Sequence, residues 1–141
     1  MGRGTPSCPG LMLALDRGGS CEGVAFRIPA AQARAELLLV WRREMLGGAY
    51  LARWVTVRTG GGAIRAVTFV ANRRHDRYAG AMDEAEVAAR IAVAHGELGS
   101  CAAYLRQTVE HLRALGVHDR RMERIEALVA RSRRPGLVRT A

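Results

Sequence analysis

Two adjacent glycines, Gly47 and Gly48, divide the middle of the chain into a run with helical spacing and a run with strand spacing. Residues 30–45, which precede the pair, carry apolar side chains at intervals of three and four, as one face of an α-helix does. Residues 53–59 and 63–72 read RWVTVRT and AIRAVTFVAN and flank three glycines, a pattern typical of a β-hairpin. Because glycine adopts positive φ without strain, the pair predicts that the helix stops there and releases the chain.

An acidic residue completes the apolar stripe of this helix. The stripe consists of Ala33, Leu37, Val40, Trp41 and Glu44, and Glu44 is the only acidic residue in the segment 37–75. A carboxyl group at the edge of an apolar face loses hydration, which favours its protonated form and suits it to proton transfer near neutral pH. The alternative is a helix-end glutamate paired with Arg42 or Arg43, and for a glutamate considered alone this ion pair is the favoured interpretation.

Turn and cap residues predict the other elements. Residues 11–16 and 21–28 are apolar runs on either side of an RGGS turn, which predicts a first β-hairpin. In the last third, three good N-cap residues predict helices that start at Asp83 and continue to Gly96, start at Ser100, and start at Asp119.

The element order is therefore β-hairpin, helix, β-hairpin and three helices, which defines an α+β fold. We expect the strands to form one small mixed or antiparallel, barrel-like sheet with flanking helices. Four strands leave unpaired edges, and the chain begins in a turn-rich segment, so the sheet is expected to lack its first strand.

Composition limits the partners of this domain. The 141 residues are 49% hydrophobic and 25% charged, which is typical of a globular protein. The net charge of +9 comes from 22 arginines without a lysine, scattered along the chain with no aromatic recognition motif, so we expect no nucleic-acid partner. The three cysteines lack Cys-x-x-Cys spacing, and no signal peptide or membrane span is visible, which predicts a reduced, cytoplasmic protein. The four histidines form no metal-ligand pattern, so no metal is expected.

Several segments together resemble the ChaC-type γ-glutamylcyclotransferases. They are RGTPSCPGLMLALDRGGSCEGVAFRIP, LVWRREMLGGAYLARWVTV, the YAG of residues 78–80, and AAYLRQTVEHLRALG. The resemblance runs in one register from Arg3 to about Val129, so it is more specific than any one short motif. It implies a γ-glutamylcyclotransferase-like domain at residues 1–130, built on a small mixed β-barrel with helices around it, followed by a basic tail at residues 131–141.

The resemblance also implies an activity. Members of this family cleave glutathione: the α-amine of the γ-glutamyl group attacks its own side-chain amide, giving 5-oxoproline and releasing Cys-Gly. This lyase reaction uses no metal or organic cofactor. Within WRREM, Glu44 occupies the position of the family's catalytic glutamate. One carboxylate can take the proton from the attacking amine and return one to the leaving amine. The expected substrate is glutathione or another γ-glutamyl compound, and glutathione catabolism in a bacterial cytoplasm is the expected setting.

Three further residues match family positions that border the substrate. Tyr50 matches a tyrosine that follows the Gly-Gly pair, and its alternative role is a hydroxyl at the barrel rim. Arg3 and Gly4 match the RG of the family's HRGxP loop, where an arginine can grip a substrate carboxylate in two places. The alternative for Arg3 is a terminal arginine without a defined role.

The sequence departs from the family at its start. Relatives open with a strand and a YGSL loop whose backbone N–H groups hold the γ-glutamyl part of the substrate, and the printed sequence contains no such segment before Arg3. We therefore expect an N-terminally truncated member, either a fragment from a late start codon or a short relative that no longer turns over glutathione. An inactive regulatory or interaction module of the same fold is the alternative function.

Overall fold

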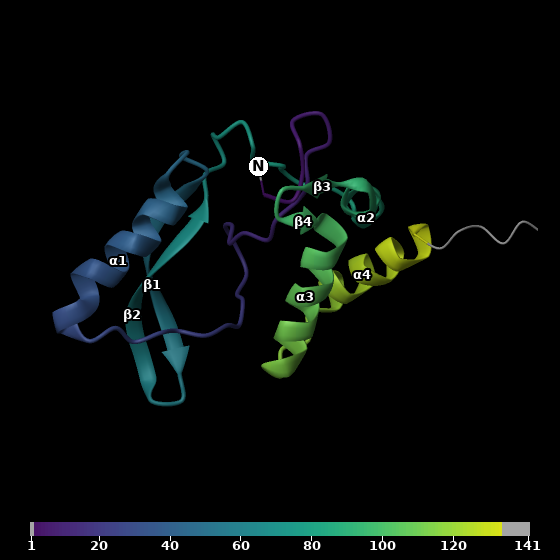
Figure 1. The fold of residues 1–141 in the computed structure, drawn as a ribbon. Coiled ribbons are helices and arrows are strands. Elements are labelled where there is room, and N and C mark those ends of the chain that lie inside the picture. Colours follow the sequence, from purple (N-terminus) through teal and green to yellow (C-terminus); the bar gives the residue numbers. More distant parts are fainter. Residues whose placement is uncertain (1, 134–141) are drawn as a thin grey trace, which may run out of the picture. The chain divides into compact units, whose positions relative to one another are not determined.

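The computed structural model describes residues 2–133 of the chain (Figure 1). The chain divides into two compact units: unit 1 contains residues up to Leu13 and from Ala81 onward, and unit 2 spans Ala14–Gly80. Unit 2 contains α1 (Ala30–Met45), β1 (Tyr50–Thr59) and β2 (Gly62–Ala71). Unit 1 contains α2 (Glu84–Val93), β3 (His95–Gly96), β4 (Gly99–Ser100), α3 (Cys101–Ala114) and α4 (Arg120–Ser132). The α+β class predicted from the element order is confirmed.

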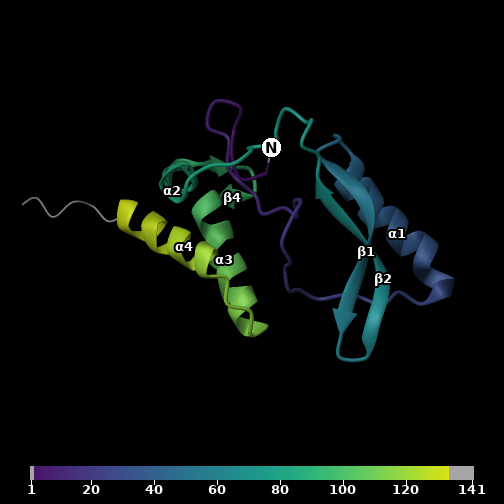
Figure 2. The same ribbon diagram turned by 180° about the vertical axis from the view of Figure 1, so that it is seen from behind.

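In unit 2, α1 lies along the hairpin formed by β1 and β2 (Figures 1 and 2). The helix has the predicted bounds, and Gly47 and Gly48 after it have φ of +106° and +69°, the positive values predicted for the helix end. The hairpin is antiparallel along its whole length. Trp41 of α1 meets Phe69 of β2 edge to face, with ring centroids 6.1 Å apart and planes inclined at 72°. This contact fixes which side of α1 faces the hairpin.

The first predicted hairpin, over residues 11–28, is wrong. Within that segment the only sheet contact is an isolated parallel bridge from Leu15 to Val70 of β2. Gly18 and Gly19 do adopt positive φ in a bend, but the runs around them do not pair. Alternating apolar residues form a strand only when another strand faces them, and the Phe26 side chain is 87% exposed. The result is two separate two-stranded sheets in the described residues, without the single barrel-like sheet of four strands that we predicted.

Side-chain caps begin the three helices of unit 1, as predicted. The side chain of Asp83 accepts the N–H of Glu86 (2.7 Å), and that of Ser100 accepts the N–H of Ala103 (3.1 Å). The side chain of Asp119 accepts the N–H groups of Arg121 and Met122 (3.0 Å each). The end of the first of these helices was predicted wrongly. Helix α2 stops at Val93, because His95 and Gly96 pair with Ser100 and Gly99 in a short hairpin.

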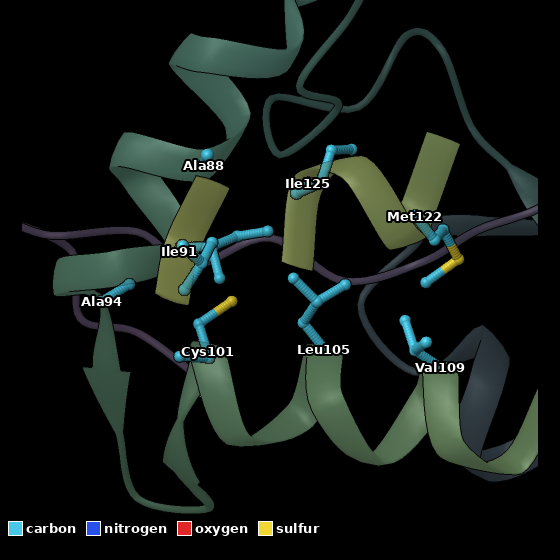
Figure 3. Close-up of a cluster of buried hydrophobic side chains, with 10 residues drawn as sticks. Ala88, Ile91, Ala94, Cys101, Leu105, Val109, Met122 and Ile125 are labelled. Atoms are coloured by element: carbon cyan, nitrogen blue, oxygen red, sulfur yellow. The ribbon is translucent and has the colours of Figure 1, made fainter. Parts of the chain in front are cut away.

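The helices α2, α3 and α4 of unit 1 enclose a hydrophobic core (Figure 3). Its buried members are Ala88, Ile91, Ala94, Cys101, Ala102, Leu105, Val109, Met122, Ile125 and Val129. Of the basic tail predicted at residues 131–141, the first two belong to α4, and residues 134–141 lie outside the described residues. None of the described helices combines the length and apolar character that a membrane span requires.

Candidate active site

Glu44 lies in the last turn of α1, three residues after Trp41 and therefore on the side of the helix that faces the hairpin. Its side chain is 23% exposed, so the carboxylate is half-buried at the edge of the apolar stripe, as the spacing predicts. Its Oε1 accepts a hydrogen bond of 2.7 Å from Nε of Arg43, so the ion pair considered as the alternative is also present. Arg43 is largely exposed, and such a pair contributes little to stability because water screens it.

Tyr50 opens β1, six residues after Glu44 and directly beyond the Gly47–Gly48 turn. It is half-buried and faces Ala71, the last residue of β2, across the hairpin. Unit 2 therefore places Glu44 and Tyr50 at the two ends of one helix–turn–strand connection. The register of the hairpin is fixed by pairs of alternating residues, so the start of β1 has a defined position.

The loop of residues 72–78 closes on this connection. Asn72 donates from its backbone N–H to the carbonyl of Ala49 (2.9 Å) and from Nδ2 to the carbonyl of Gly48 (2.8 Å). A Cβ on Gly47 would lie 3.1 Å from Nη2 of Arg77, so the Arg77 guanidinium packs against the turn. The only part of this loop that entered the family resemblance is Tyr78, the first residue of the YAG segment.

Asp16 ties this loop to the segment that precedes α1, and no local pattern in the sequence marks this contact. The carboxylate accepts hydrogen bonds from Arg73 at 2.8 Å (Nε) and 3.0 Å (Nη2), from the hydroxyl of Tyr78 at 2.6 Å, and from the N–H of Arg17 at 2.7 Å. These donors, Arg73 above all, hold the pKa of Asp16 well below its usual range. The same contact raises the pKa of Tyr78, because its phenol donates to an anion.

Arg3 and Gly4, the other predicted site residues, belong to unit 1. Arg3 donates from Nη1 to the carbonyl of Leu98, and its guanidinium lies 5.7 Å from the ring centroid of Tyr104. Arg3 is therefore anchored. Gly4 is buried, and a Cβ there would lie 2.1 Å from the backbone nitrogen of Gly10, so only glycine fits. Both residues of the RG match thus have a structural role in unit 1.

The fold has counterparts among solved structures. Two crystal structures of the yeast γ-glutamyl cyclotransferase specific to glutathione superpose with TM-scores of 0.64 and 0.63 at 18% and 17% sequence identity. They cover 75% and 76% of this chain, and 57% and 58% of the yeast chains. The fold is therefore that of the γ-glutamylcyclotransferases, although the sheets of this chain are not closed.

Sequence comparison gives the family itself. The family model described as ChaC-like protein matches residues 1–132, and the chain belongs to that family. A glutathione-specific γ-glutamylcyclotransferase of Escherichia coli K12 is 40% identical over 119 residues, which are 84% of this chain and 52% of the relative. Glutathione-specific γ-glutamylcyclotransferase 1 of Danio rerio is 30% identical over 143 residues, covering 96% of this chain and 73% of the relative. The chain spans about half the length of the Escherichia coli relative.

Proposed function

We propose that this chain is a γ-glutamylcyclotransferase, a lyase of glutathione catabolism that converts glutathione to 5-oxoproline and Cys-Gly. The observation that carries the proposal is the half-buried carboxylate of Glu44 at the end of α1, on the side of Trp41. The 40% identity to a relative named for this activity supports glutathione as the substrate. A cytoplasmic location in a bacterium is part of the same proposal.

The reaction needs only proton transfer and the correct approach of two ends of one molecule. The α-amine nitrogen of the γ-glutamyl group forms a bond to the γ-carbonyl carbon, and the bond from that carbon to the cysteinyl nitrogen breaks. Glu44 accepts the proton released by the attacking amine and gives it to the leaving amine, so the carboxylate is regenerated. Holding the ends together supplies much of the rate, because ring closure is intramolecular. Arg43 orients the carboxylate through Oε1.

We assign substrate binding to Arg3, Gly4 and Tyr50. Glutathione carries two carboxylates, and a guanidinium can donate five hydrogen bonds, of which Arg3 commits Nη1 to the carbonyl of Leu98. Its remaining N–H groups suit a substrate carboxylate. Gly4 permits the close approach of the Gly10 backbone next to Arg3, and Tyr50 lies at the start of β1, beyond the turn that follows Glu44.

Substitution of one side chain tests the proposed chemistry. Glu44→Gln keeps the size of the side chain but removes its proton-transfer capacity, so we expect release of 5-oxoproline to fall about 100-fold or more. Glu36→Gln is the matched control, since Glu36 is an exposed glutamate of the same helix, and its turnover should equal that of the wild type. Mass spectrometry of 5-oxoproline and Cys-Gly gives the rates. Equal turnover by Glu44→Gln and the wild type removes Glu44 from the mechanism.

A further inference from the structure

Asp16 joins segments that are more than fifty residues apart, and the proposed reaction does not use it. Its two carboxylate oxygens accept two hydrogen bonds from the guanidinium of Arg73 and one from the hydroxyl of Tyr78. Next to it, the carbonyl of Leu15 accepts the N–H of Ala71 at 2.8 Å. The segment at residues 15–16 is therefore attached both to the end of β2 and to the loop that follows. We call the contacts of Asp16 with Arg73 and Tyr78 the Asp16 clamp.

The clamp holds the loop of residues 72–78 near both of its ends. Between Arg73 and Tyr78 the loop is closed by its own hydrogen bonds, from the N–H of His75 to the carbonyl of Asn72 (3.0 Å) and from the N–H of Tyr78 to the carbonyl of His75 (2.8 Å). The N–H of Arg77 donates to Nδ1 of His75 at 3.1 Å. Because the loop is bonded internally, we expect it to respond to the clamp as one piece.

The loop in turn supports the turn that follows Glu44. Gly47 and Gly48 have no side chains that could fix their conformation, and glycine is the most flexible residue. The turn has one hydrogen bond of its own, from the N–H of Gly48 to the carbonyl of Met45 at 3.2 Å. The loop adds the other contacts: Asn72 donates to the carbonyls of Gly48 and Ala49, and the Arg77 guanidinium packs against Gly47. The turn sets where the last turn of α1 ends, and that turn of helix carries Glu44.

We propose that Asp16 is a positioning residue for Glu44: by holding Arg73 and Tyr78 it fixes the loop of residues 72–78, which fixes the turn after Glu44. The effect on catalysis rests on the proposed function, whereas the effect on the loop does not. Removing the charge of Asp16 weakens the hydrogen bonds that its carboxylate accepts from Arg73 and Tyr78, since charge-assisted hydrogen bonds are about twice as strong as neutral ones. A displacement of about 1 Å of a catalytic group can lower a rate about 100-fold, so a smaller displacement gives a measurable loss.

Two matched substitutions test this role in the full chain. Asp16→Asn keeps the shape of the side chain and removes its charge. Glu84→Gln likewise keeps the shape and removes the charge at another bidentate ion pair, in unit 1. There the carboxylate of Glu84 accepts two hydrogen bonds from the guanidinium of Arg124, at 2.9 Å and 2.7 Å. For glutathione turnover we expect Asp16→Asn to lower kcat about 10-fold with KM changed less than about 2-fold, and Glu84→Gln to leave both unchanged. A wild-type kcat in Asp16→Asn, or an equal loss in Glu84→Gln, overturns the inference.

Hydrogen exchange separates failure of this inference from failure of the proposed function. The backbone N–H of Asn72, bonded to the carbonyl of Ala49, reports whether the loop remains closed on the turn. We expect it to exchange about 10-fold faster in Asp16→Asn and at the wild-type rate in Glu84→Gln. If the wild type does not release 5-oxoproline, the proposed function fails. The exchange rate of the Asn72 N–H then tests by itself whether the Asp16 clamp holds the loop. Unchanged exchange at Asn72 in Asp16→Asn overturns the inference even when glutathione is turned over.

Discussion

Different kinds of interaction stabilise the interior of unit 1 and the interior of unit 2. Unit 1 encloses a core of buried side chains contributed by its helices. Among residues 14–80, which form unit 2 and are all described, no side chain is buried. Unit 2 is held by the β1–β2 ladder, the contact of Trp41 with Phe69, and the polar contacts of Asp16 and Asn72. Burial of apolar surface stabilises unit 1, whereas directional contacts specify unit 2.

The difference matters because the proposed proton-transfer group is in unit 2. A half-buried carboxylate is reachable by substrate and solvent, which a residue of the unit 1 core is not. Regions with little buried apolar surface open more readily than packed cores, and binding sites are commonly drawn from them. In such a region a catalytic side chain needs another means of fixation. The hydrogen-bonded loop of residues 72–78 supplies one at the turn that follows Glu44.

Matched Leu→Ala substitutions in the two units should give the largest difference in the free energy of unfolding. Leu105 is 5% exposed in the core of unit 1, and Leu39 is 63% exposed on α1 of unit 2. We expect Leu105→Ala to lower the free energy of unfolding by about 3 kcal/mol, because it leaves a cavity. Leu39→Ala should change it by less than about 0.5 kcal/mol. Urea unfolding followed by circular dichroism gives both values. Equal losses in the two variants would show that α1 buries as much surface as the core does.

A smaller effect concerns the helix starts. The three described helices of unit 1 each have a side-chain cap, whereas α1 begins after Pro29 without one. The Asp119 carboxylate accepts two backbone N–H groups, so Asp119→Ala should cost about 1 kcal/mol of unfolding free energy. The control is Asp76→Ala, at an exposed aspartate of unit 2 that caps no helix, with an expected change below about 0.5 kcal/mol. A loss as large at Asp76 would argue against a capping role for Asp119.

Local patterns predicted the elements whose determinants are close together in the sequence. The bounds of α1 follow from its spacing and from Gly47–Gly48, and the caps of the unit 1 helices follow from single residues. The failed hairpin at residues 11–28 depended on a partner strand, which alternation alone does not supply. Helix α2 ended early because His95 and Gly96 pair with residues beyond the next turn, a competition that helical spacing does not reveal.

The candidate site shows the same division between local and distant determinants. Glu44 could be found because an acid within an apolar stripe is visible in the sequence, and the family resemblance gave that position a role. Its catalytic role and the binding roles of Arg3, Gly4 and Tyr50 remain predictions. Asp16 could not be found, because its partners Arg73 and Tyr78 follow it by 57 and 62 positions. Ion pairs over such separations depend on tertiary structure and leave no periodic signal.

The smallest expected effect is a shift in one tyrosine titration, and it sharpens the contrast between the polar clamp of unit 2 and the core of unit 1. The hydrogen bond to Asp16 raises the pKa of Tyr78 above the usual value near 10. Its contribution to stability is therefore fully present below about pH 10 and is lost as the pH rises through the raised pKa. Tyrosinate absorbance should lose an alkaline component in Tyr78→Phe, and in Asp16→Asn that component should move toward lower pH. Glu84→Gln, in unit 1, should leave the curve unchanged. An unaltered curve in Asp16→Asn would mean that Asp16 does not control this phenol.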